Sequence, residues 1–212
     1  MIKTNQYLEK FARKRSGWVE TLEQYAKEYR VPIIDKVSGQ FLLQLVRMNR
    51  PKAILEIGTA IGYSTLLMHE IVPDASIVTI EKNEQTAEIA QENIVNYALK
   101  IDNISLIKGD ALEVIERFPI DTKFDFVFID AAKGQYERFF SLIDPLVERN
   151  GVIITDNVLF RSFVLEKEEN VPKRYRTLVK KLKVFNENMM HNEEYHSTMI
   201  PLGDGLIISV KK

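Results

Sequence analysis

Five short apolar runs, each followed by an amphipathic helical pattern, fill the middle of this 212-residue chain. The runs lie at residues 53–57, 76–80, 104–107, 124–129 and 151–155. Apolar runs of this length predict buried strands, and strands that alternate with helices predict a doubly wound α/β fold with a mainly parallel sheet. Right-handed crossovers bring the carboxyl ends of the strands to one edge of such a sheet, where its ligands bind.

An acidic residue lies at the end of each of these runs: Glu56, Glu81, Asp110, Asp130 and Asp156. All five are therefore expected at the same edge of the sheet. Because an unpaired carboxylate is costly to bury, folding alone gives no reason for five of them there. We interpret this edge as the functional site and the rest of the chain as the structure that holds it.

Two of these strand ends carry side chains that suit a metal ion. The fourth run ends in Asp130, and the fifth ends in Asp156 and Asn157. If the two strands are parallel neighbours, about 4.8 Å apart, these side chains surround one point. Two carboxylates and an amide oxygen form a ligand set that suits Mg²⁺. Lys133 is a candidate general base, because a nearby cation disfavours its ammonium form; the alternatives are an ion pair with Asp130 or a plain surface position.

A turn with two glycines, Gly58-Thr59-Ala60-Ile61-Gly62, follows the first run. Its spacing differs from the G-x-G-x-x-G of dinucleotide-binding proteins, and no glycine-lysine pair marks a phosphate loop. Glu81 is placed to accept hydrogen bonds from ribose hydroxyls, and Asp110 could reach an adenine. These parts predict a nucleoside cofactor without a pyrophosphate, for which S-adenosylmethionine is the obvious candidate. A purely structural glycine turn is the alternative.

The amino-terminal part of the chain predicts helices before the first strand. Residues 1–30 show two amphipathic stretches, broken near residues 16–17, and a further helix is expected at about residues 38–48. The basic residues between 10 and 15 indicate either a solvated helix end or a lid or substrate arm. No linker or low-complexity tract divides the chain, so we expect one domain over residues 1–212, with 1–30 as its helical arm.

The carboxyl-terminal part is more basic. Residues 161–183 contain eight basic and three acidic residues, and a helix is expected from Pro172 to about residue 188. Two strands, at about residues 196–202 and 206–210, flank the turn Gly203-Asp204-Gly205 and predict an antiparallel hairpin. The basic segment indicates either a surface that meets phosphates or a solvated helix.

Composition excludes several classes of protein and several kinds of site. Hydrophobic residues make up 45% of the chain, and no apolar run approaches the roughly 18 residues of a membrane span. The amino terminus has no signal-peptide core, so a cytoplasmic protein is expected. The absence of cysteine excludes disulfides, zinc-thiolate sites and thiol nucleophiles, and the three histidines have no metal-ligand spacing. A net charge of −1 gives no overall attraction for nucleic acid, although a local patch remains possible.

The motifs resemble those of the cation-dependent class I O-methyltransferases, the group that includes catechol and caffeoyl-coenzyme A O-methyltransferases. The similarity extends over about residues 31–212 and rests on residues 55–64, 128–133, 155–157 and 203–206. It implies a Rossmann-like, mainly parallel seven-stranded sheet, S-adenosylmethionine as the methyl donor and a homodimer. A structurally similar module that binds a cofactor or RNA without catalysis is an alternative, which an intact Lys133 and an intact metal set disfavour.

The resemblance also assigns roles to individual residues. It implies that Asp130, Asp156 and Asn157 bind Mg²⁺, and that Lys133 is the catalytic base beside Asp130. It implies a cofactor site formed by these residues: Ile34, Glu56, Gly58, Thr59, Ser64, Glu81, Asp110, Ala111 and Asp130.

A more specific similarity is to bacterial enzymes that methylate 5-hydroxyuridine at the tRNA wobble position to 5-methoxyuridine. It rests on residues 54–64, 129–136, 151–160 and 172–174. A wobble base lies in a single-stranded loop and can be splayed out. We therefore expect the tRNA anticodon loop as substrate, with a small catechol or phenylpropanoid-type hydroxyl as the alternative, and Phe160 as either a stacking or a core residue. The candidates for phosphate contacts are Arg161, Lys173, Arg174, Arg176, Lys180, Lys181 and Lys183.

Overall fold

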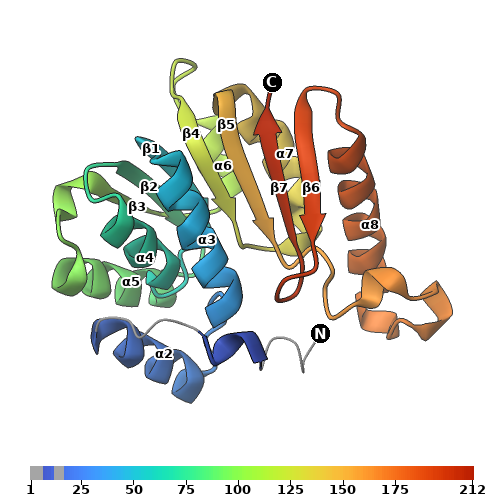
Figure 1. Cartoon of the computed structure of the whole chain (residues 1–212), viewed down its shortest axis with the longest axis horizontal. Helices are drawn as coiled ribbons and strands as arrows, with labels where there is room; N and C mark the ends of the chain where they lie inside the picture. Colours follow the sequence, from blue (N-terminus) through green and yellow to red (C-terminus); the bar gives the residue numbers. More distant parts are fainter. Residues whose placement is uncertain (1–6, 12–16) are drawn as a thin grey trace.

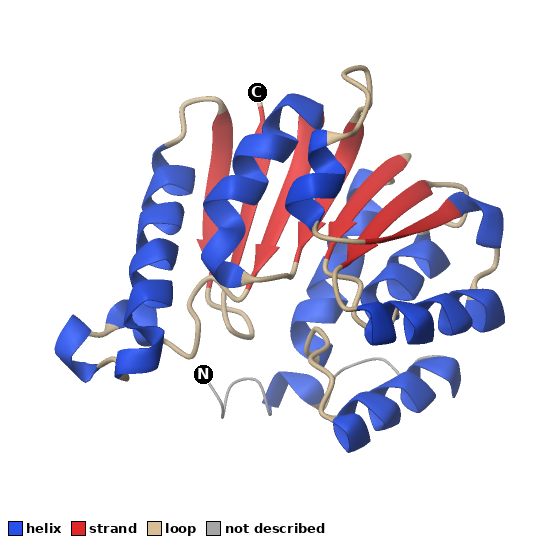
Figure 2. Ribbon diagram, turned by 180° about the vertical axis from the view of Figure 1, so that it is seen from behind, coloured by secondary structure: helices blue, strands red, loops and turns tan. Residues whose placement is uncertain are grey.

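The computed structural model describes residues 7–11 and 17–212. Residues 1–6 and 12–16, which include part of the basic cluster predicted at 10–15, lie outside the described residues. The described residues form a seven-stranded sheet in the order β3-β2-β1-β4-β5-β7-β6, with helices on both faces (Figures 1 and 2). Strands β1 to β5 are parallel and the last two are antiparallel, which confirms the predicted fold class.

The elements follow the predicted alternation of strands and helices. The strands are β1 (Ala53–Ile57), β2 (Ser76–Glu81), β3 (Ile104–Lys108), β4 (Phe124–Ile129), β5 (Val147–Asp156), β6 (Tyr195–Ile200) and β7 (Leu206–Lys211). The helices are α2 (Gly17–Tyr29), α3 (Lys36–Asn49), α4 (Tyr63–Ile71), α5 (Glu84–Tyr97), α6 (Ala111–Glu116), α7 (Tyr136–Ile143) and α8 (Arg176–His191). The short 3₁₀ turns include η2 (Lys133–Gln135), η4 (Phe163–Leu165) and η6 (Lys173–Tyr175).

Side chains of the sheet alternate between two apolar clusters, one on each face. Ile54 and Phe126 pack in the cluster that includes α2, α3, α4 and α5. Leu55 and Val127 pack in the cluster that includes α6, α7 and α8. Because the central strands are covered on both faces, they read as nearly continuous apolar runs in the sequence. Within the described residues, no helix is both long and apolar enough to cross a membrane.

The order of the strands reverses between β1 and β4, which are neighbours in the sheet. Such a reversal is the point at which open α/β sheets bind ligands. Gly58, directly after β1, has a φ of 102°, and a Cβ atom at this position would overlap the carbonyl oxygen of Asp130, directly after β4. Glycine is therefore required here, and it brings the predicted cofactor turn against the predicted metal-binding strand end.

Two element boundaries differ from the predicted ones, each for a local reason. Strand β5 begins at Val147 rather than at residue 151, because Phe124 and Phe126 pair with Val147 and Val152, so that β5 bulges between these pairs. Helix α8 begins at Arg176 rather than at Pro172. Residues 173–175 form the turn η6 instead, which the N–H of Tyr175 closes by donating to the carbonyl of Pro172 at 2.8 Å.

Replacing Gly58 with alanine should destabilise the protein, because the new Cβ atom would both overlap the Asp130 carbonyl and force a strained φ. We expect the free energy of unfolding, measured in urea, to fall by more than about 2 kcal/mol. Gly17→Ala is the matched control, because no atom lies within 4 Å of a Cβ at that position. Equal stability of the two variants would contradict the proposed backbone contact.

Candidate active site

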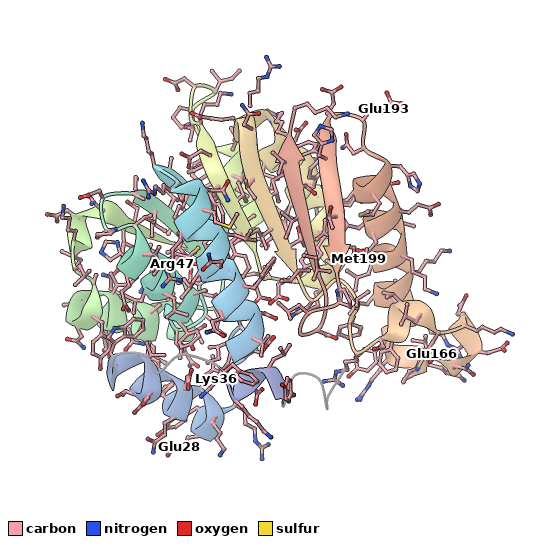
Figure 3. The ribbon with its side chains drawn as sticks, in the orientation of Figure 1. Glu28, Lys36, Arg47, Glu166, Glu193 and Met199 are labelled. Atoms are coloured by element: carbon pink, nitrogen blue, oxygen red, sulfur yellow. The ribbon has the colours of Figure 1, made fainter. Side chains whose placement is uncertain are left out.

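A cavity of about 800 Å³ lies at the edge of the sheet where the parallel strands end, here called the carboxyl edge. Its wall includes the α2–α3 linker (residues 31–35), the turns after β1 to β5 and the turn at Gly203 and Asp204. Helix α2 and the segment before α8 flank this edge from opposite sides (Figure 1). Lys36 and Glu166 mark these two sides, whereas Glu193 lies at the opposite end of the molecule (Figure 3). The cavity has the size of a site for a small molecule or cofactor.

The residues that the sequence predicted for the cofactor and metal sites meet at this cavity, with one exception. Those that line it are Ile34, Gly58, Thr59, Ser64, Glu81, Asp110, Ala111, Asp130, Lys133, Asp156 and Asn157. The exception is Glu56, which has no exposed surface and lies beneath the wall.

Glu56 supports the turn after β1 from below. Its side chain points toward α4 and accepts hydrogen bonds from the hydroxyls of Ser64 at 2.5 Å, Thr79 at 2.6 Å, and Thr65. Burial raises the pKa of the Glu56 carboxyl, and these three hydrogen bonds oppose that shift. Of these partners, Ser64 lines the cavity, so Glu56 could influence a bound cofactor by orienting Ser64.

Glu81 and Asp110 line the cavity at the ends of β2 and β3. Glu81 is fixed by two backbone N–H groups, which donate from Ala60 at 2.8 Å and from Asn83 at 2.7 Å. Asp110 caps α6 by accepting from the N–H of Leu112 at 3.0 Å. Its carboxylate also accepts from Lys82 at 2.8 Å, and that hydrogen bond is the main cause that lowers the pKa of Asp110. Each carboxylate oxygen can accept more than one hydrogen bond, so both groups could still bind hydroxyl or amine donors.

Asp130, Asp156 and Asn157 come together because β4 and β5 are paired in register. Ile129 pairs with Thr155, so the two aspartates follow the last pair of the ladder. The N–H of Asn157 donates to Asp156 Oδ1 at 2.6 Å, and Asn157 adopts a left-handed φ of 57°. The buried hydroxyl of Tyr136 donates to the carbonyl of Asp156 at 2.8 Å and fixes the end of β5.

Electrostatics at this point of the cavity favour a bound cation. Burial, followed by the charge of Asp130, raises the pKa of Asp156 to about 8. Burial also raises the pKa of Asp130, and Lys133 opposes that shift from a distance of 3.8 Å between Nζ and Oδ1. One lysine does not neutralise both the buried Asp156 and the partly buried Asp130, which therefore interact strongly with any cation that enters.

The residues present fit a divalent metal ion, but only if an amide completes the set. Within residues 7–11 and 17–212, no group of three or more histidine, aspartate or glutamate side chains is arranged to hold a metal. The two aspartates would therefore need the side-chain oxygen of Asn157 as a further protein ligand. Mg²⁺ accepts such a mixed set of oxygen ligands and keeps several waters.

Two further acidic residues on the cavity wall were not predicted as site residues. Asp35 caps α3 by accepting from the N–H groups of Val37 and Ser38, and its charge raises the pKa of Asp156. Asp204 lies in the β6–β7 turn and accepts from the N–H of Arg161 at 2.5 Å. Sequence signals existed for a helix cap and a hairpin turn, but not for the presence of either residue on the wall of this cavity.

The fold and the cavity together define a class: a Rossmann-like protein with a cavity at the carboxyl edge of its sheet that is lined by acidic side chains. The family model for O-methyltransferases matches residues 12–212, and the chain belongs to that family. The predicted recognition of this family is confirmed, and the protein is an S-adenosylmethionine-dependent O-methyltransferase.

Relatives and solved structures agree with this assignment. Caffeoyl-CoA O-methyltransferase 1 of Arabidopsis thaliana is 30% identical over 179 residues, which cover 80% of this chain and 68% of that protein. A crystal structure of a Staphylococcus aureus protein, provisionally described as a caffeoyl-CoA O-methyltransferase, is 37% identical with a TM-score of 0.90 and covers 99% of both chains. The O-methyltransferase of Bacillus cereus, solved with S-adenosylhomocysteine, is 29% identical with a TM-score of 0.85 over 100% of both chains.

The raised pKa of Asp156 predicts that the metal-free protein becomes less stable as the pH rises from about 4 to about 8. In this range the folded state keeps a proton that the unfolded state, with an ordinary carboxyl pKa, has released. The contribution of Asp156 to the free energy of unfolding should fall by up to about 1.4 kcal/mol per pH unit.

The measurement is urea unfolding of the metal-free protein across this pH range. Asp156→Asn is the matched control, because its amide is nearly isosteric and does not titrate, so its pH dependence should be shallower. Identical slopes for the two proteins would contradict the raised pKa.

Proposed function

We propose that this protein transfers the methyl group of S-adenosylmethionine to 5-hydroxyuridine at the wobble position of tRNA, with Mg²⁺ held by Asp130, Asp156 and Asn157. The observation that carries the chemical part is the position of Asp130. Its backbone packs against the turn after β1, and its side chain lies beside Asp156 and Lys133. Cofactor and acceptor would therefore be held side by side in one cavity.

The residues of the chain would divide the chemistry among them. Glu81 and Asp110 would hold the nucleoside part of the cofactor, and Gly58, Thr59, Ser64, Ile34 and Ala111 would shape its site. Lys133, with 20% of its side chain exposed, would take the proton of the acceptor hydroxyl as the catalytic base. When bound, Mg²⁺ would favour the anionic form of that hydroxyl and orient it toward the methyl group.

The surface next to the cavity supports an RNA acceptor. Residues 171–186 contain six basic and no acidic side chains. The ion pairs found among the described residues all lie elsewhere, so none of these six is neutralised by a carboxylate. A basic surface of this kind attracts phosphates independently of sequence.

A second candidate acceptor is a small hydroxylated aromatic molecule. It is favoured by the relatives named as caffeoyl-CoA O-methyltransferases, which belong to the same family. The same cavity and the same set of acidic residues would serve either acceptor. The two candidates therefore differ in what lies outside the cavity rather than in the methyl transfer itself.

The proposal extends to the organisation of the protein. We propose that residues 1–212 act as one domain, with residues 1–30 as a helical arm, and that two copies form a homodimer. A tRNA substrate also implies action in the cytoplasm.

Incubation with S-adenosylmethionine, Mg²⁺ and tRNA that contains 5-hydroxyuridine should yield 5-methoxyuridine, detected by mass analysis of the digested nucleosides. Lys133→Ala is the control for the chemical step and should lower the rate at least about 100-fold. Methyl transfer to a catechol, with none to tRNA, would replace the RNA acceptor by the small aromatic one.

Replacing Asp156 with alanine should lower kcat at least about 100-fold and leave the affinity for S-adenosylmethionine within about threefold, because the residue belongs to the metal set. Excess chelator should inhibit the unaltered protein to a similar extent, and added Mg²⁺ should restore it. Asp121→Ala, at an exposed acidic residue outside the cavity wall, is the matched control. Full activity in chelator would exclude the metal role.

A further inference from the structure

Three aromatic rings pack together just outside the cavity. The ring centroids of Phe160 and Tyr175 lie 5.3 Å apart at 82°, and those of Phe163 and Tyr175 lie 5.8 Å apart at 31°. Phe160 and Phe163 complete the triangle at 6.0 Å. We call these three residues the aromatic cluster. Phe160, predicted either to stack on a substrate or to join the core, is partly buried against the apolar core and packs against the turn before α8.

Two arginines lie over one ring of the aromatic cluster. The guanidinium carbon of Arg174 lies 4.6 Å from the centroid of the Tyr175 ring, and that of Arg161 lies 5.8 Å from it. Both arginines are exposed, and neither takes part in an ion pair with a described carboxylate. A ring face attracts a guanidinium and limits its motion, so both cations are held at the ring of Tyr175 despite their like charge.

Backbone hydrogen bonds place Phe160 and Arg161 next to Asn157 and Asp204, on the side of the cavity where the acceptor is expected. The N–H of Phe160 donates to the carbonyl of Asn157 at 3.2 Å, and the N–H of Arg161 donates to Asp204 on the cavity wall. Residues 160–162 have φ values of 39°, 55° and 62°, a conformation that is costly for residues other than glycine. These hydrogen bonds hold the strained turn, so the positions of Phe160 and Arg161 depend directly on the site.

Helix α8 approaches the site from the same side. A Cβ atom at Gly134, next to Lys133, would lie 3.5 Å from Leu178 and 4.0 Å from the side chain of Lys181. The basic start of α8 therefore packs against the turn η2 that carries Lys133. In Figure 1 the segment before α8 extends outward from the carboxyl edge of the sheet.

We propose that Arg161 and Arg174, held on the ring of Tyr175, bind a backbone phosphate of the RNA next to the nucleotide that is methylated. The inference rests on the proposed tRNA substrate and specifies how it is held. A guanidinium matches the geometry of a phosphate in a bidentate contact, and contacts of this kind fix the register of a nucleic acid on a protein. Neither arginine lines the cavity, so their ligand must extend beyond the group that reacts.

The surrounding charges favour a polyanion over an isolated phosphate. Lys173 and Lys180 are exposed on the same segment, in a stretch without acidic residues, and Lys181 lies beside η2. These lysines would attract neighbouring phosphates, whereas the two ring-bound arginines would select one position. Exposed lysines alone would give affinity without positioning, and the ring of Tyr175 is the feature that separates the two roles.

The experiment compares Tyr175→Leu, Tyr175→Phe and Arg174→Ala with the unaltered full-length protein, using an anticodon stem-loop RNA that carries 5-hydroxyuridine. Tyr175→Leu keeps both charges and removes the ring, so it should raise KM for the RNA at least about fivefold and change kcat little. Tyr175→Phe keeps the ring and should behave like the unaltered protein. Arg174→Ala should raise KM similarly and reduce the slope of log affinity against log salt by about 0.7.

Controls separate this inference from the function on which it rests. Arg149→Ala removes an exposed charge at the amino-terminal part of β5, away from the carboxyl edge, and should leave KM unchanged. A free 5-hydroxyuridine nucleoside lacks the phosphate and should be used equally by all variants. Thermal unfolding and S-adenosylmethionine affinity verify that Tyr175→Leu is folded.

The possible outcomes are distinct. If the unaltered protein does not methylate the RNA, the proposed function fails and the phosphate contact fails with it. If it does methylate the RNA but Tyr175→Leu and Arg174→Ala keep the normal KM, only the phosphate contact is overturned. If these variants instead lose affinity for an acyl-coenzyme A thioester acceptor and not for RNA, the arginines bind the phosphates of a small acceptor, which also overturns the inference.

Discussion

The close approach of two backbone segments, Gly58 after β1 and Asp130 after β4, is the constraint on which the site depends. A side chain at Gly58 would occupy the space of the Asp130 carbonyl, so the two segments could not meet. Their contact joins the turn that borders the cofactor cavity to the strand end that carries Asp130 and Lys133. The reversal of strand order between β1 and β4 opens the cavity at this same point.

The acidic residues around Asp156 lower the stability of the empty site and favour the binding of a cation. Burial raises the pKa of Asp156 most, the charges of Asp130 and Asp35 raise it further, and Lys133 opposes the shift only in part. Repulsion among buried acids weakens the folded state, but it also favours a cation that enters the cavity. Two expected ligands, a divalent metal and a sulfonium cofactor, are cations. The same charges that destabilise the empty site would therefore stabilise the loaded one.

The segments on either side of the cavity have different parts in the structure. Helix α2 buries Val19, Leu22 and Ala26 and is tied to the start of α4 by the hydroxyl of Tyr63, which donates to Glu23 at 2.8 Å. Helix α2 is thus packed against the domain, next to the linker (residues 31–35) that forms part of the cavity wall. The segment that contains Phe160 and Tyr175 instead has partly buried rings and exposed arginines beside the cavity, and we propose that it distinguishes one acceptor from another.

The sequence by itself determined the alternation of strands and helices, the parallel sheet and the meeting of Asp130, Asp156 and Asn157. These follow from local periodicity and from the rule that parallel strands end at one edge. Only the tertiary structure decided that Glu56 lies beneath the cavity wall, that Asp35 and Asp204 line the same cavity as Asp156, and that two arginines lie at the ring of Tyr175. The physical reason is that burial, charge repulsion and ring contacts depend on which distant segments pack together. The spacing of residues in the sequence does not specify that packing.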